Sequence, residues 1–246
     1  MIPWEHLDTG PIPGEDTPLR LMRRGEEYSI FIGPTELMGT RVSASETALA
    51  ALVCARLGDR RRARILIGGL GMGFTLRAAL DALGPDAAIV VAELVPAVAE
   101  WARGPLARIF AGSLDDPRVD LRVDDVGAQI RLVPGQYDAI LLDVDNGPEG
   151  LMRAENDRLY GLEGLAQARA ALRPGGILGI WSQGPNAAFT TRLKRSGFAV
   201  EEERVRAHGR GGRRHVLWLA TRPMGGARPT PGISRGRGAA DRGRRG

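Results

Sequence analysis

Three glycines at alternate positions stand between an apolar run and a helix-like run. The segment ARILIGGLGMG, residues 63–73, contains Gly69, Gly71 and Gly73. Glycine lets a backbone turn sharply and approach a ligand without a Cβ, and the free N–H groups of a helix start add hydrogen-bond donors. A dinucleotide fingerprint would require glycine at position 74, which is Phe. The spacing therefore favours a nucleoside of the S-adenosylmethionine type, in which no pyrophosphate has to lie on the helix end.

Acidic side chains follow the next three apolar runs. Glu93 comes about twenty residues after the glycine loop, where a carboxylate can accept both ribose hydroxyls of a nucleoside; the alternative is a solvated acid at a helix start. Asp124 or Asp125 could accept an adenine amino group, and we favour Asp125. The following run ends at Asp143. Because the carboxyl ends of parallel strands meet at one edge of a sheet, we expect these acids to share one crevice.

The elements that position these side chains alternate regularly. The expected strands cover 64–68, 88–93, 119–123, 137–143 and 177–182, and the helices that follow them cover 74–83, 96–110, 126–132, 159–172 and 187–196. Such alternation predicts a parallel sheet with helices on both faces. The last two apolar runs, 198–206 and 214–221, are separated by a short glycine-rich stretch and should form an antiparallel edge hairpin. The fold class is therefore α/β, with a doubly wound, mostly parallel, seven-stranded Rossmann-like sheet.

A small β segment is expected before this sheet. Residues 17–41 show short apolar runs split by turn signals at Arg24-Gly25 and Gly33-Pro34, which predict a hairpin or meander. Ser43 and Glu46 stand at capping-box spacing and predict the start of a helix that enters the main domain. The expected division is a β segment over 1–42, a nucleoside-binding catalytic domain over 43–222 and a disordered tail over 223–246.

Composition excludes several other classes of protein. With 246 residues, of which 43% are hydrophobic, the chain suits one α/β domain with a small appendage. No apolar run approaches the roughly 20 residues of a membrane span, and the first residues lack a signal-peptide pattern, so we expect a cytoplasmic protein without a membrane partner. The single cysteine, Cys54, and three histidines without ligand spacing predict no disulfide framework and no metal site. Cys54 lies in an apolar helix pattern and is expected in the core.

Positive charge is concentrated at the C-terminal end. The net charge of the chain is +5, and residues 222–246 hold seven arginines and one acid, so residues 1–221 carry about −1. The Arg-, Gly- and Pro-rich tail could contact RNA through counterion release, but a solvated tail without a partner is the preferred interpretation.

The motifs together resemble the spermidine synthase, or polyamine aminopropyltransferase, family, which has the class I methyltransferase-like fold. The resemblance runs from about Leu37 to Gly184 and rests on the segments ILIGGLGMG, VVAEL, DPRVDLRVDD, YDAILLDVDNGPEG, LYGLEGLAQARAALRPGGIL and SQGP. It implies transfer of an aminopropyl group from decarboxylated S-adenosylmethionine to a polyamine, with Asp143 at the place of the family's catalytic Asp. The family's loop Asp, which holds the amino group of the aminopropyl arm, corresponds here to Gly71.

The resemblance also implies an acidic groove for the polyamine. Asp145, Glu149 and Tyr160 would line this groove, and Glu46 would close it from the N-terminal side. The second Asp of the family's motif corresponds to Asn146 or to neighbouring Asp145. The alternatives are an exposed loop position for Asp145 and core packing for Tyr160. The N-terminal β segment could build a homodimer, as the resemblance implies.

Aminopropyl transfer is the preferred function, and two alternatives remain. In aminopropyl transfer the attacking amine must lose a proton, which a carboxylate such as Asp143 can accept. Methyl transfer from S-adenosylmethionine itself is the enzymatic alternative, because the loop lacks the acid that would repel the carboxylate of that molecule. A nucleoside-binding or RNA-associated protein without turnover is the non-enzymatic alternative.

Overall fold

The apolar runs of the sequence form the expected seven-stranded sheet. The computed structural model describes residues 2–41, 43–132, 134–144, 158–208 and 211–225. The strands of this sheet are β5 (Arg64–Gly68), β6 (Ala88–Glu93), β7 (Val119–Val123), β8 (Tyr137–Leu142), β9 (Leu172–Ser182), β10 (Ala199–His208) and β11 (Gly211–Thr221). Their order is β10-β11-β9-β8-β5-β6-β7, and strands β5 to β9 are parallel. The α/β fold class is confirmed.

The order of strands creates a crevice at the middle of the sheet. From β5 the chain moves outward through β6 and β7, and it then returns to the other side of β5 with β8. The connections after β5 and β8 therefore leave in opposite directions, and ligands bind at such a switch point in open α/β sheets. The last two strands form the expected antiparallel hairpin beside β9.

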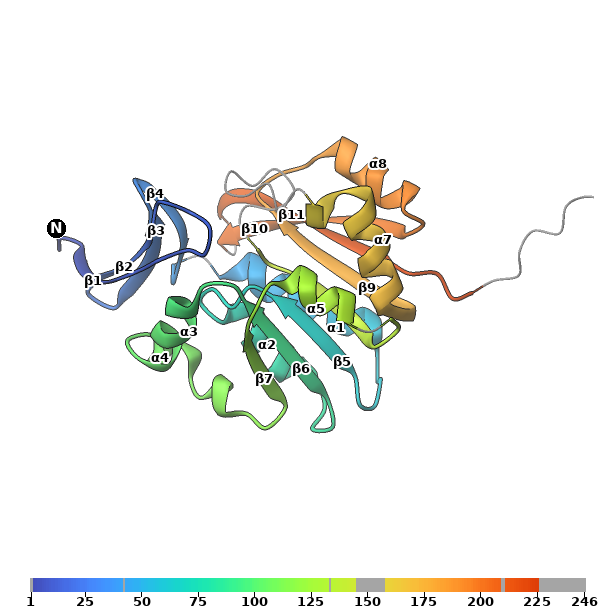
Figure 1. Ribbon diagram of the computed structural model, residues 1–246, viewed down its shortest axis with the longest axis horizontal. Coiled ribbons are helices and arrows are strands. Elements are labelled where there is room, and N and C mark those ends of the chain that lie inside the picture. Colours follow the sequence, from blue (N-terminus) through green and yellow to red (C-terminus); the bar gives the residue numbers. More distant parts are fainter. Residues whose placement is uncertain (1, 42, 133, 145–157, 209–210, 226–246) are drawn as a thin grey trace, which may run out of the picture.

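Helices cover both faces of the sheet (Figure 1). They are α1 (Ala44–Leu57), α2 (Phe74–Ala82), α3 (Pro96–Arg103), α4 (Ala107–Phe110), α5 (Val126–Leu132), α7 (Leu162–Ala171) and α8 (Ala187–Arg195), with a short 3₁₀ turn at Ser113–Asp115. One core cluster joins α1, α2 and α3 to the sheet, and a second joins α5, α7 and α8 to its other face. In the described part of the chain, no helix has both the length and the apolar character that a membrane crossing requires.

A separate four-stranded antiparallel sheet lies beside the main one (Figure 1). Its strands are β1 (Glu5–Gly10), β2 (Leu19–Arg24), β3 (Glu27–Ile32) and β4 (Thr35–Gly39). The meander predicted over 17–41 is confirmed, whereas β1 was not predicted. Its sequence, EHLDTG, has no alternation of apolar residues, and the strand forms because it pairs with β2 and packs on α3. The expected domain boundaries after residues 42 and 222 stay predictions.

Two details differ from the sequence expectation, and a third agrees with it. The helix expected over 96–110 is broken between α3 and α4 at Gly104 and Pro105, because a residue before proline disfavours helical geometry. The Ser43 side chain makes no capping hydrogen bond, although α1 starts where the capping box predicted. Cys54 is buried, and burial raises the pKa of its thiol to about 11, so the core position expected for it is confirmed.

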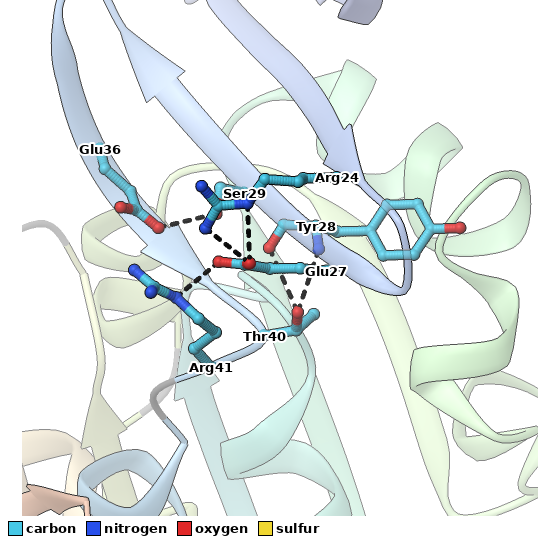
Figure 2. A network of polar contacts seen from close by, with 7 residues as sticks. All are labelled: Arg24, Glu27, Tyr28, Ser29, Glu36, Thr40 and Arg41. Carbon is cyan, nitrogen blue, oxygen red and sulfur yellow. Dashed lines mark hydrogen bonds and ion pairs between the residues drawn. The ribbon is translucent and has the colours of Figure 1, made fainter. Parts of the chain in front are cut away.

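A network of polar contacts joins side chains on the face of the small sheet that carries Glu27 and Ser29 (Figure 2). Glu27 forms ion pairs with Arg24 at 2.8 Å and with Arg41 at 2.5 Å. Ser29 donates a hydrogen bond to Glu36 at 2.7 Å. Arg41 comes directly after β4, close to the start of α1. Partly exposed pairs of this kind contribute at most about 1 kcal/mol each to the stability of the fold.

Candidate active site

The glycine loop lies at the carboxyl end of β5, and two of its three glycines line a pocket. Gly69 has a φ of +87°, and a Cβ on it would lie 2.5 Å from the carbonyl oxygen of Asp143. Gly71 faces Met38, whose sulfur would lie 3.3 Å from an added Cβ. Both glycines line the pocket, together with Asp143. Gly73 does not line the pocket. It lies at the start of α2 and packs against the ring of Phe110 from α4.

The carboxylate of Glu93 is buried at the end of β6 and holds the glycine loop. Its Oε2 accepts a hydrogen bond from the backbone N–H of Leu70 at 2.9 Å, and its Oε1 accepts one from that of Val95 at 2.8 Å. Burial raises the pKa of Glu93, and these backbone donors oppose that effect. Glu93 also lines the pocket, where its remaining lone pairs can accept hydroxyl donors. Its contact with ribose stays a prediction.

We expect Glu93→Ala to weaken co-substrate binding by about 10-fold or more, because a buried hydrogen-bonding carboxylate is lost and the loop amides lose their acceptor. Calorimetric titration measures this change, with Glu100→Ala on the exposed side of α3 as the matched control. A dissociation constant for Glu93→Ala equal to that of the unaltered protein would exclude the ribose assignment.

Asp124 and Asp125 both line the pocket at the end of β7. Asp125 caps the start of α5, since its Oδ1 and Oδ2 accept hydrogen bonds from the N–H groups of Gly127 and Ala128, each at 3.0 Å. Asp124 is held by the side-chain amide of Gln129. The structure therefore brings both candidates for the adenine contact to the pocket, and the preference for Asp125 stays a prediction.

Asp143 lies directly after β8, half-buried, with a second acid beside it. Its backbone N–H donates to the carbonyl of Gly68 at 3.0 Å, and its Oδ2 accepts a hydrogen bond from the hydroxyl of Thr75 at 2.6 Å. Burial and the charge of Glu46 raise the pKa of Asp143 to about 7. Burial also raises the pKa of Glu46, which accepts a hydrogen bond from Ser45 at 2.7 Å. The site thus contains a carboxyl group that titrates near neutrality.

Other residues expected in the acceptor groove are distributed differently. Asp145, Asn146 and Glu149 lie outside the described residues. Tyr160 is buried and packs edge-to-face on Phe189, with ring centroids 5.6 Å apart, and it does not line the pocket. Its position corresponds to the core-packing alternative. Trp181 packs against the core cluster that includes α1, α2 and α3.

Two contributions to the site were not predicted. The small sheet and the segment around β1 cover the pocket with Ile12, Leu19, Leu37 and Met38. Thr75 contacts Asp143 from the first turn of α2. The contact of Thr75 has no signal in the sequence, because 68 residues separate the two side chains. The apolar residues of the N-terminal segment carried the pattern of a core, which does not distinguish a pocket lining from packing.

Comparisons with known proteins define the class of this fold. No family model matches the chain. Spermidine synthase from Thermotoga maritima superimposes with a TM-score of 0.71, at 17% identity, over 89% of this chain and 74% of that one. A methyltransferase from Burkholderia thailandensis, solved with 1,6-didemethyltoxoflavin and S-adenosylhomocysteine, superimposes with a TM-score of 0.52, at 22% identity, over 74% of this chain and 79% of that one. The protein therefore has the class I methyltransferase-like fold.

Sequence similarity narrows the class further. The polyamine aminopropyltransferase of Mycobacterium tuberculosis is 32% identical over 187 residues, which are 72% of this chain and 34% of that protein. Polyamine aminopropyltransferase 2 of Pseudomonas aeruginosa is 32% identical over 126 residues, which are 50% of this chain and 34% of that protein. The matches thus span about a third of the length of these relatives. The chain is a homologue of the polyamine aminopropyltransferases, and the resemblance found in the sequence motifs is confirmed.

Proposed function

We propose that this protein transfers an aminopropyl group from decarboxylated S-adenosylmethionine to an amine of a polyamine, with Asp143 as the general base. The observation that carries the proposal is the carboxyl of Asp143, which lines the pocket at the end of β8 beside Glu46 and has a pKa of about 7. A base that titrates near the operating pH is suited to remove the proton of an attacking amine. The homology with polyamine aminopropyltransferases supports the same reaction.

The co-substrate would be held along the carboxyl edge of the sheet. Glu93 would accept the ribose hydroxyls, Asp125 or Asp124 the adenine amino group, and the backbone at Gly69 and Gly71 would lie against the nucleoside. The fold neighbour solved with S-adenosylhomocysteine supports a co-substrate of this class.

The charges of the pocket favour the decarboxylated co-substrate. The described residues that line the pocket include five acids, Glu15, Glu93, Asp124, Asp125 and Asp143. No Arg, Lys or His is among the described lining residues. The carboxylate of intact S-adenosylmethionine would meet no cation among these residues. The decarboxylated molecule has a sulfonium and an ammonium group and no anionic group, so the negative potential attracts it.

In the proposed reaction, the nitrogen of the neutral amine attacks the methylene carbon bonded to the sulfonium. A C–N bond forms as the C–S bond breaks, and sulfur keeps the electron pair and leaves as a neutral thioether. Asp143 accepts the proton that nitrogen loses. Because the sulfonium is already an activated leaving group, orientation of the two reactants supplies most of the remaining rate enhancement.

Methyl transfer from intact S-adenosylmethionine is the second candidate, and the absence of an acidic side chain at Gly71 favours it. Calorimetric titration with the two forms of the co-substrate separates the candidates, followed by chromatographic detection of aminopropylated product from a diamine. We expect the decarboxylated form to bind more tightly. Preference for the intact form would support methyl transfer, and binding of neither would support the non-enzymatic alternative.

A further inference from the structure

Thr75 contacts the proposed base from behind the pocket. It belongs to the first turn of α2, is only 3% exposed, and does not line the pocket. Its Oγ1 lies 2.6 Å from Oδ2 of Asp143 and 3.4 Å from the carbonyl oxygen of Glu46. A hydroxyl has one proton to donate, and the shorter contact with a carboxylate is the stronger one. Thr75 therefore donates to Asp143.

This hydrogen bond makes the two oxygens of Asp143 unequal. Oδ2 is occupied by the hydroxyl of Thr75, and Oδ1 has no corresponding donor among the described residues. The backbone of Asp143 is held as well, through its N–H and the carbonyl of Gly68 at 3.0 Å. The main chain and Oδ2 of Asp143 are thus both held, and Oδ1 is the oxygen available to a group that enters the pocket.

The electrostatic surroundings otherwise oppose a charged Asp143. The charge of Glu46 on α1, which does not itself line the pocket, acts on Asp143, and the other acids that line the pocket are Glu15, Glu93, Asp124 and Asp125. Burial and Glu46 raise the pKa of Asp143, and the hydrogen bond from Thr75 is the effect that lowers it. Without Thr75, the pKa would therefore rise further.

We propose that Thr75 is a positioning residue, which holds Oδ2 of Asp143 so that Oδ1 receives the proton of the attacking amine. This inference rests on the proposed function, in which Asp143 is the base. It assigns to α2, which follows the glycine loop, a residue that acts in the reaction through Asp143.

The test compares Thr75→Val, which keeps the shape of the side chain and removes the donor, with Thr75→Ser, which keeps the donor. Thr191→Val, on an exposed face of α8, is the matched control. We expect Thr75→Val to move the acidic limb of the kcat profile upward by about one pH unit, which lowers kcat about five-fold at pH 7. Activity should recover at higher pH, Thr75→Ser should retain the original profile, and co-substrate affinity should change little in both.

A direct titration separates this inference from the proposed function. Carbon-13 NMR of labelled Asp carboxyls, with the Asp143 signal assigned through its loss in Asp143→Asn, reports the midpoint of Asp143 without any turnover. If the unaltered protein transfers no aminopropyl group, the proposed function fails, and the titration still measures the effect of Thr75. The inference would be overturned if the titration midpoint of Asp143 were unchanged in Thr75→Val, or if it were shifted in Thr75→Ser. If Thr75→Val does not fold, Thr75→Ala supplies the same comparison.

Discussion

Asp143→Asn is expected to reduce aminopropyl transfer by about 100-fold or more, while the dissociation constant of the co-substrate changes only a few-fold. The amide keeps the shape of the carboxyl and still accepts the hydrogen bond from Thr75, but it cannot accept the proton of the amine. Initial rates with saturating decarboxylated S-adenosylmethionine and a diamine measure the first effect, and calorimetry measures the second. Asp59→Asn, at an exposed position after α1, is the control.

The same substitution should change the dependence of stability on pH. The pKa of Asp143 is about 7 in the folded protein and near 3.8 in the unfolded chain, so the folded state holds the proton more tightly, and the free energy of unfolding falls progressively as pH rises from about 3.8 to about 7. The free energy of unfolding of Asp143→Asn should therefore exceed that of the unaltered protein above pH 7. Unchanged turnover would exclude Asp143 as the base, and equal stabilities at pH 8 would exclude its raised pKa.

Gly69→Ala is expected to lower the free energy of unfolding by about 3 kcal/mol or more and to abolish measurable co-substrate binding. Its φ of +87° strains any L side chain, and the new Cβ would lie 2.5 Å from the carbonyl oxygen of Asp143. The backbone of Asp143 cannot shift freely, because its N–H donates a hydrogen bond to the carbonyl oxygen of Gly68. Chemical denaturation and calorimetric titration measure the two effects.

Gly33→Ala is the matched control for this substitution. Gly33 also has a positive φ, of +49°, but nothing lies within 4 Å of a Cβ placed on it. It should cost only the conformational strain, about 1 kcal/mol, and leave binding unchanged. Equal losses in the two variants would mean that the contact with Asp143 carries no additional cost.

The strands around the site were predictable because their pattern is local. The bounds of β5, β6 and β7 are those predicted, since β5 and β6 are buried apolar runs and the edge strand β7 alternates apolar and polar residues. The glycine loop and the acids at the ends of β6, β7 and β8 follow from the same rule, because parallel strands bring their carboxyl ends to one edge. The pocket confirms that Gly69, Gly71, Glu93, Asp124, Asp125 and Asp143 lie together.

Local patterns along the chain predicted the fold class, the edge of the sheet where the pocket lies, and the resemblance to aminopropyltransferases. Only the tertiary structure decided which candidates line the pocket: it placed Gly73 against Phe110 and Tyr160 in the core. Tertiary contacts also set the pKa of Asp143, which burial and the charge of Glu46 from α1 raise and the hydrogen bond from Thr75 on α2 lowers. The physical reason is that burial, charge and hydrogen bonding act between residues distant in sequence, whereas periodicity records only the surroundings of neighbours along the chain.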